Sequence, residues 1–217
     1  GKDICRAAAS FAAGTGLGTD VFRPRWLCWL SDEVLQLLAR VLNEVERYGL
    51  WPKMVDTILI AQIPKPGGGR RPIGLLPTLV RVWEKARRSV VAAWRTSVER
   101  RYNYAGKGKS SEVAAWIQAH HAEVAVARGG YSAAGLLDLT KAFEMVRLEL
   151  VWRAGLKMHF PPVILRLELE AFALDRRLSS MGVVTEPVST CSAILAGGGF
   201  ATDALYLIMV GVCDGVL

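Results

Sequence analysis

Three groups of residues in this sequence could act on a phosphorylated ligand. The first is the segment 63–73, in which Lys65, Arg70 and Arg71 flank three consecutive glycines. Glycine lets backbone amides approach a phosphate closely, and a guanidinium group can grip two of its oxygens. The same pattern is also typical of an ordinary hairpin loop with basic side chains, so the segment alone leaves both interpretations open.

The second group is a single carboxylate, Asp138, near the end of the apolar stretch 132–139. A carboxylate at the end of an apolar strand is costly unless it is paired or binds a cation. Such a residue is a natural Mg²⁺ ligand for phosphoryl transfer. A role as the cap of a following helix agrees equally well with the pattern.

The third group is the glycine turn 197–199, which precedes a predicted helix. Bare backbone at such a turn could pack against a sugar or a base pair, whereas the structural alternative is flexibility at the start of the helix. This turn is the weakest of the three indications when it is taken alone.

The charge of the chain is concentrated in one region. The net charge is +7, and residues 64–109 contain 12 Lys and Arg residues but only 2 acidic ones. A local basic surface fits a polyphosphate partner, such as nucleic acid or a nucleoside triphosphate. A well-solvated helix face is the alternative.

Composition excludes several other classes of protein. Hydrophobic residues make up 52% of the chain, which is enough for a folded core. The four cysteines lack the spacing of zinc ligands, which indicates reduced thiols in an intracellular protein. The apolar stretch 193–212 has the length of a membrane span, but its three consecutive glycines, 197–199, and Asp203 argue against insertion, so we expect no membrane association.

Both helices and strands are predicted to position the three candidate groups of residues. A helix is predicted over 32–48, with Ser31 as its N-cap and Gly49 at its end. The remaining pattern predicts, in order, a strand at 57–63, a loop at 64–72, a basic helix at 78–102, a helix at 111–127, a strand at 132–139, helices at 142–154 and 163–174, a hairpin at 176–188 and a helix at 200–212. We therefore expect a helix-rich α+β fold with a small antiparallel sheet.

The spacing of apolar residues predicts which face of the helix 32–48 is buried. The apolar face of the first helix is expected to consist of Val34, Leu37, Leu38, Val41, Leu42 and Val45.

In this order, the segments resemble the consecutive sequence blocks of reverse transcriptases of the non-LTR retroelement type. The segment 63–73 is similar to the first fingers block, and 104–111 to the next one. Asp138 followed by Lys-Ala-Phe is similar to the first palm block, and 193–202 resembles the second. The resemblance implies a helical lead-in at 1–57, followed by the fingers and part of the palm of a right-hand polymerase at 58–217.

The resemblance implies an RNA-directed DNA polymerase, a nucleotidyltransferase of a retrotransposon that extends a DNA primer on an RNA template. Asp138 would be one of three carboxylates that hold two Mg²⁺ ions, assisted by the carbonyl of Leu139.

The same resemblance implies the residues that bind the deoxynucleoside triphosphate. Lys65 and Arg71 would hold its phosphates, and Gly197 would line the nucleotide site. Phe143 would press on the sugar and exclude a 2′-hydroxyl group.

Further basic residues are expected to contact the template and the primer: Arg70, Arg87, Arg88, Lys107 and Lys109. We expect a nuclear location, although no targeting signal is visible.

The sequence departs from the family at two places. Ala196 stands where the family often has Gln, and the chain reaches Leu217 before the expected pair of aspartates. The chain is therefore expected to be truncated within the palm. The alternative is a non-catalytic nucleic-acid-binding remnant of the same fold.

Since one carboxylate cannot hold two metal ions, the isolated chain should not extend a primer. The measurement is a primer-extension assay with an RNA template, Mg²⁺ and deoxynucleotides. Robust synthesis would contradict this expectation.

Overall fold

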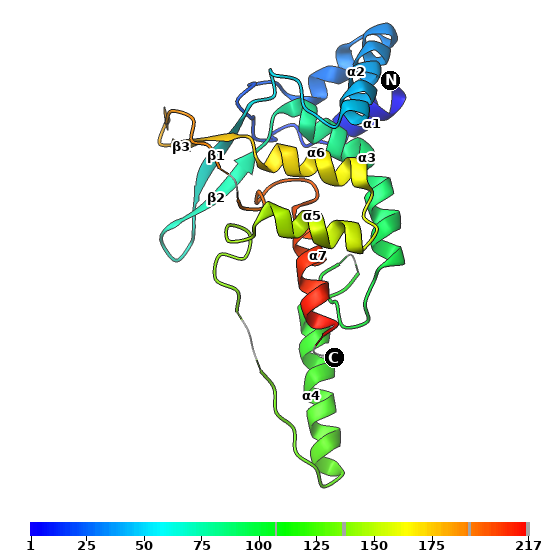
Figure 1. The fold of residues 1–217 in the computed structure, drawn as a ribbon. Coiled ribbons are helices and arrows are strands. Elements are labelled where there is room, and N and C mark those ends of the chain that lie inside the picture. Colours follow the sequence, from blue (N-terminus) through cyan, green and yellow to red (C-terminus); the bar gives the residue numbers. More distant parts are fainter. Residues whose placement is uncertain (107, 136–137, 191, 216–217) are drawn as a thin grey trace. The chain divides into compact units, whose positions relative to one another are not determined.

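The chain folds into two compact units. The computed structural model describes residues 1–106, 108–135, 138–190 and 192–215. The first unit combines Gly1–Trp94 with Lys141–Leu217, and the second is Arg95–Thr140. Because the first unit is discontinuous in sequence, segments from both ends of the chain form its core (Figure 1).

The helices and strands follow one another in a fixed order (Figure 1). They are α1 (Lys2–Ala9), the 3₁₀ helix η1 (Pro24–Trp29), α2 (Asp32–Tyr48), β1 (Thr57–Pro64), β2 (Arg70–Leu75), α3 (Thr78–Ser97), α4 (Ser111–Ala127), α5 (Leu148–Lys157), α6 (Pro162–Phe172), β3 (Asp175–Ser180), β4 (Val183–Val184) and α7 (Ala201–Cys213). The predicted α+β class is confirmed.

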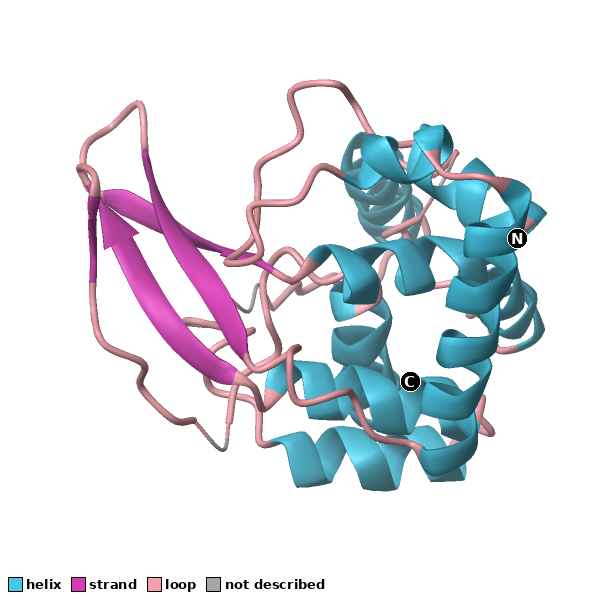
Figure 2. Ribbon diagram, turned by 90° about the horizontal axis from the view of Figure 1, so that it is seen from above, coloured by secondary structure: helices cyan, strands magenta, loops and turns pink. Residues whose placement is uncertain are grey.

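The sheet is mixed, so the prediction of an antiparallel sheet was wrong. Its strand order is β2-β1-β3-β4, with antiparallel pairing between β1 and β2 and between β3 and β4. β1 and β3 are parallel, with Thr57 opposite Asp175. Parallel neighbours need a long crossover connection, which the helices between β2 and β3 supply here. Figure 2 shows the strands of the first unit gathered beside its helices.

The loop between β1 and β2 is shorter than predicted. Arg70, Arg71 and Pro72 belong to β2 and pair with Pro64, Ile63 and Gln62 of β1. The turn itself contains two glycines with positive φ angles, which is a conformation that other residues rarely adopt. The basic side chains therefore stand on a hairpin with a defined register.

The bounds predicted for α2 are confirmed, but its predicted buried face was partly wrong. Ser31 accepts a hydrogen bond from the Val34 amide, and Gly49 ends the helix with a φ of 66°. The residues that become buried are Leu35, Leu42 and Val45. The predicted members Val34, Leu37 and Val41 remain exposed. Leucines and valines on both sides of this helix allow two faces, and tertiary packing selects one of them.

A fully buried indole, Trp83, connects three helices in the core. Its ring packs edge-on against Trp51 at 5.4 Å and against Phe200 at 6.3 Å. Its Nε1 donates a hydrogen bond to Glu46 Oε1 at 2.7 Å. Trp51 in turn donates to the carbonyl of Leu167 in α6 at 2.9 Å. Buried indoles need such partners for their N–H groups, so these bonds fix how the helices meet.

The strand predicted over 132–139 is absent from the described part of that segment. Residues 132–135 and 138–139 form no strand, and 136–137 lie outside the described residues. Alanine and glycine have low β propensity, and a strand needs a partner to be stable. The helix predicted at 142–154 begins only at Leu148, because Lys141 adopts a positive φ of 51° and 140–145 form turns.

The other predicted elements are present with small changes at their ends. α3 ends at Ser97 rather than near residue 102, whereas α4 has the predicted bounds. The predicted hairpin turn at Gly182 and the final helix are confirmed. No helix among the described residues is long and apolar enough to cross a bilayer.

Two helical glycines provide a test of the packing between α5 and α6. A Cβ atom at Gly155 would collide with Leu165, whereas one at Gly211 in α7 would meet nothing within 4 Å. Gly155→Ala should lower the free energy of unfolding by roughly 1–3 kcal/mol. Gly211→Ala should leave it unchanged or raise it by up to about 1 kcal/mol, because alanine favours helix. Urea denaturation measures both, and equal effects would contradict the packing described.

Candidate functional site

Strand β2 contacts the glycine turn directly. The amide of Gly74 donates a hydrogen bond to the carbonyl of Ala196 at 2.7 Å. The next residue, Gly197, has a φ of 116°, and a Cβ atom there would collide with the Gly74 carbonyl oxygen. Gly74, the residue that follows the segment 63–73, is therefore joined to the segment 193–202 through adjacent backbone that only glycine permits at Gly197.

Helix α3 holds the same turn through a buried carboxyl group. Glu84 Oε1 accepts a hydrogen bond from the Gly199 amide at 2.8 Å. Glu168 of α6 is also buried, and a Cβ atom at Gly198 would lie 3.3 Å from its Oε1. Neither carboxyl oxygen of Glu168 has a well-formed hydrogen bond within the described structure. The turn is thus enclosed by two carboxyl groups from different helices.

Burial raises the pKa of both carboxyl groups. Desolvation raises the pKa of Glu84 to about 7, although the Gly199 amide and the nearby cations Arg81 and Arg88 oppose this shift. Desolvation, followed by the neighbouring Glu84 carboxyl, raises the pKa of Glu168 well above its ordinary value, and Asp203 adds to this effect. At neutral pH the pair therefore retains at least one proton, because two buried carboxylates would repel each other.

A basic cavity of about 360 Å³ opens beside the turn. Its lining consists of Phe11, Arg81, Glu84, Lys85, Arg88, Gly197, Gly198, Gly199 and Thr202. Arg81 donates a hydrogen bond to the carbonyl of Gly16 at 2.7 Å. Arg81 and Lys85 lie over the ring of Phe11, at 5.2 and 5.1 Å from its centre. Three cations from successive turns of α3 thus surround exposed glycine backbone, which suits an anionic ligand.

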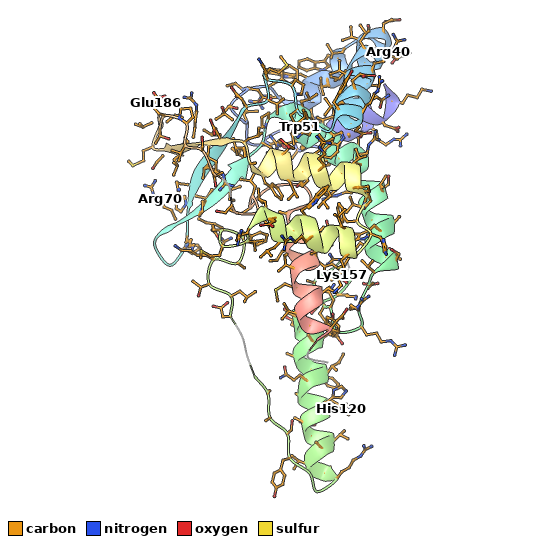
Figure 3. All side chains as sticks on the ribbon, in the orientation of Figure 1. Arg40, Trp51, Arg70, His120, Lys157 and Glu186 are labelled. Atoms are coloured by element: carbon orange, nitrogen blue, oxygen red, sulfur yellow. The ribbon has the colours of Figure 1, made fainter. Side chains whose placement is uncertain are left out.

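The predicted cations of the hairpin are exposed. Lys65 and Arg71 lie in solvent on the two arms of the β1–β2 hairpin. Arg70 donates a hydrogen bond to Ser180 Oγ of β3, and its side chain lies on the sheet side of the unit in Figure 3. The hairpin therefore presents exposed positive charge at Lys65 and Arg71, whereas Arg70 is partly engaged by the sheet.

Arg87 has a structural partner that the sequence did not reveal. Its guanidinium group forms a two-pronged ion pair with Glu46 of α2, with Nη2 at 2.9 Å from Oε2. Both side chains are partly buried. The charge of Arg87 is therefore satisfied within the fold, while its neighbour Arg88 faces solvent and the basic cavity.

A second cavity of about 440 Å³ lies against one face of the sheet. Its lining includes Gln62, Pro72 and Gly74 from the hairpin and Arg176 from β3. The Arg176 guanidinium donates to the carbonyl of Phe172 at 3.2 Å and to two carbonyls just before the glycine turn. This arginine therefore helps to hold the chain segment that forms one wall of the cavity.

Phe143 lies next to that wall. It is half-buried, and its carbonyl accepts a hydrogen bond from the amide of Ile194 at 2.9 Å. Its backbone is thus joined to the segment leading into Gly197, although the two residues belong to different predicted sequence blocks.

The predicted metal ligands belong to the second unit. Asp138 and Leu139 are both exposed. In the described parts of the chain, no group of three or more His, Cys, Asp or Glu side chains could hold a metal ion. The donors at hand are one carboxylate and one carbonyl, which do not make a complete Mg²⁺ site, so Mg²⁺ stays a prediction.

The two basic residues of the second unit that were predicted to bind nucleic acid are Lys107 and Lys109. The Lys109 ammonium group lies 2.7 Å from Glu99 and donates to the carbonyl of Asn103 at 2.8 Å. The predicted nucleic-acid contact Lys107 lies outside the described residues.

Four residues of the basic cavity and its buried wall were not among the predicted site residues: Arg81, Glu84, Lys85 and Glu168. The helical spacing of Arg81, Lys85 and Arg88 could have indicated that the cations share one face. No local pattern distinguishes the buried Glu84 or Glu168 from surface acids.

No model of a known protein family matches this chain, and no curated protein sequence matches it.

The buried carboxyl pair predicts a pH-dependent stability. A carboxyl whose folded pKa is about 7 and whose unfolded pKa is about 4.5 keeps its full stabilising effect below pH 4.5 and loses it as pH rises through 7. The loss from one such group is about 3 kcal/mol. Glu84→Gln keeps an acceptor for the Gly199 amide without the charge. The free energy of unfolding of wild type should therefore fall more between pH 5 and pH 8 than that of Glu84→Gln.

Urea denaturation at both pH values measures this difference. Glu33→Gln provides the matched control, because Glu33 is exposed in the first turn of α2. A difference between wild type and Glu84→Gln that stays constant with pH would show that Glu84 is not a buried, weakly acidic group.

Proposed function

We propose that this chain is part of an RNA-directed DNA polymerase of the non-LTR retroelement type. The observation that carries the proposal is the hydrogen bond between Gly74 and Ala196. It joins the residue that directly follows the first fingers block, 63–73, to the second palm block, 193–202, as the resemblance assigns these blocks. This contact supports the family-level order of blocks more strongly than any single motif does.

The cations beside this contact fit the handling of phosphates. Arg71 stands on the exposed hairpin, and Arg81, Lys85 and Arg88 surround the glycine turn. Phosphoryl transfer proceeds with charge spread over phosphate oxygens, so positioned cations and backbone amides stabilise both the ligand and the transition state. In this proposal Lys65 and Arg71 bind the triphosphate.

The α3 cations contact the nucleic-acid backbone in the same proposal. Three positive charges around bare backbone would neutralise several phosphates at once, which makes binding sensitive to salt. The partners would be an RNA template, a DNA primer and deoxynucleoside triphosphates, and the place of action the nucleus.

Magnesium and the sugar contact remain parts of the proposal. Asp138 and the carbonyl of Leu139 would contribute ligands to Mg²⁺, which when bound activates a hydroxyl nucleophile and stabilises the leaving group. Phe143 would restrict the site to deoxynucleotides through the bulk of its ring.

A second function is favoured by the position of Asp138. This residue is exposed and lies outside any described strand, rather than at the end of a paired one. Such a position suits a non-catalytic nucleic-acid-binding protein of the same fold, in which the basic site remains and the metal does not bind. Both candidates require that nucleic acid binds to the α3 cations.

Charge reversal tests that shared requirement. Lys85→Glu and Arg88→Glu should weaken binding to an RNA–DNA primer-template duplex, because both cations line the basic cavity. The slope of log affinity against log salt should become shallower by roughly one for each lost phosphate contact. Binding titrations at several salt concentrations provide the measurement.

Arg40→Glu is the matched control, because Arg40 is exposed on α2 (Figure 3). It changes the net charge by the same amount as Arg88→Glu. Arg87 is unsuitable, because its reversal would break the ion pair with Glu46. If Arg40→Glu and Arg88→Glu weaken binding equally, net charge alone explains the affinity and the proposed site is wrong.

A further inference from the structure

A second feature of the first unit, outside the proposed polymerase site, combines aromatic and cationic side chains. The segment 22–29 reads Phe-Arg-Pro-Arg-Trp-Leu-Cys-Trp. Its helix η1 turns once every three residues, so Trp26 and Trp29 fall on the same side. Their rings are stacked, with centres 6.3 Å apart and planes inclined by 25°. We call these two residues the tryptophan pair.

The tryptophan pair packs against the protein on one side and is exposed to solvent on the other. Phe22 packs edge-on against Trp26, with ring centres 5.3 Å apart. Pro24 and Leu27 of the same turn are buried. Trp29, however, is 79% exposed. Trp26, which is held by Phe22, thus supports the exposed ring of Trp29, and this aromatic surface in water is open to a planar ligand.

A cavity of about 400 Å³ adjoins the tryptophan pair. Both indoles line it, together with Arg23, Arg25 and small residues from 9–15. Arg23 donates to the carbonyl of Ala13 at 3.0 Å, which fixes one wall. Arg25 is exposed, and the lining contains no acidic side chain. The cavity therefore combines a size suited to a small planar group with uncompensated positive charge at its rim.

This cavity and the basic cavity share one chain segment. Ala9, Ala12 and Ala13 line the cavity of the tryptophan pair, whereas Phe11 lines the basic cavity beneath Arg81. A ligand long enough to occupy both would cross a single stretch of backbone. This arrangement favours an extended polyanion over a small molecule.

We propose that the tryptophan pair binds an unpaired nucleobase of single-stranded nucleic acid, with Arg25 contacting an adjacent phosphate. The inference rests on the proposed function, which it extends by a site for unpaired bases. Bases within a duplex are already stacked on their neighbours, whereas an unpaired base leaves a face free for an aromatic platform. Stacking of this kind accepts any base, so the site would not read sequence.

The test compares a labelled twelve-nucleotide oligo(dT) with an abasic oligomer of the same length, by fluorescence anisotropy. Wild-type protein should bind oligo(dT) about tenfold more tightly than the abasic oligomer. Trp29→Ala should lose that preference and leave the abasic affinity unchanged, whereas Trp29→Phe should keep most of it. Arg25→Gln should weaken binding to both oligomers.

Trp116→Ala is the matched control, because Trp116 is 77% exposed on α4 of the second unit. It should change neither affinity. Equal binding of the two oligomers by wild-type protein, or an unchanged preference in Trp29→Ala, would overturn the inference.

The results also separate this inference from the proposed function. Salt-sensitive duplex binding without a preference for bases in the single strand rejects only the tryptophan-pair site. Absence of binding to both oligomers and to the duplex rejects both.

Discussion

The hydrogen bond between the buried carboxyl group of Glu84 and the amide of Gly199 is the interaction on which the site depends. Because Glu84 belongs to α3, this bond sets where the whole helix meets the glycine turn. Arg81, Lys85 and Arg88 follow one face of the same helix, so they are brought around the turn as a consequence. The buried carboxyl group of Glu84 thus positions the three cations of α3, which stay accessible to solvent in the cavity.

The buried carboxyl groups and the cations of α3 stabilise each other. Burying Glu84 beside Glu168 is unfavourable, and the α3 cations and the turn amide reduce that cost. The carboxyl group in turn reduces the repulsion between the cations when no ligand is bound. An anion entering the cavity would meet a positive site whose geometry is already fixed, so little reorganisation would accompany binding.

Local sequence signals predicted the bounds of helices and strands better than the contacts between them. Ser31 and Gly49 specified both ends of α2, because capping is a property of neighbouring residues. The choice of Leu35 over Val34 for the core, and of Glu46 as the partner of Arg87, depends on what packs against the helix. The parallel pairing of β1 with β3 is likewise non-local. At the site, the hairpin and turn were identified, but the buried acids between them were not.

The parallel pairing also has a consequence for how the protein is made. Thr57 pairs with Asp175, so β1 is synthesised more than a hundred residues before its parallel neighbour β3. Until then the edge of β1 that later pairs with β3 stays open, and another chain could occupy it. Pairing at such separation closes a large loop and is intrinsically slow. The first unit therefore depends on the open edge of β1 staying free of other strands while residues 65–174 are translated, a stage at which chaperones can protect exposed strand edges.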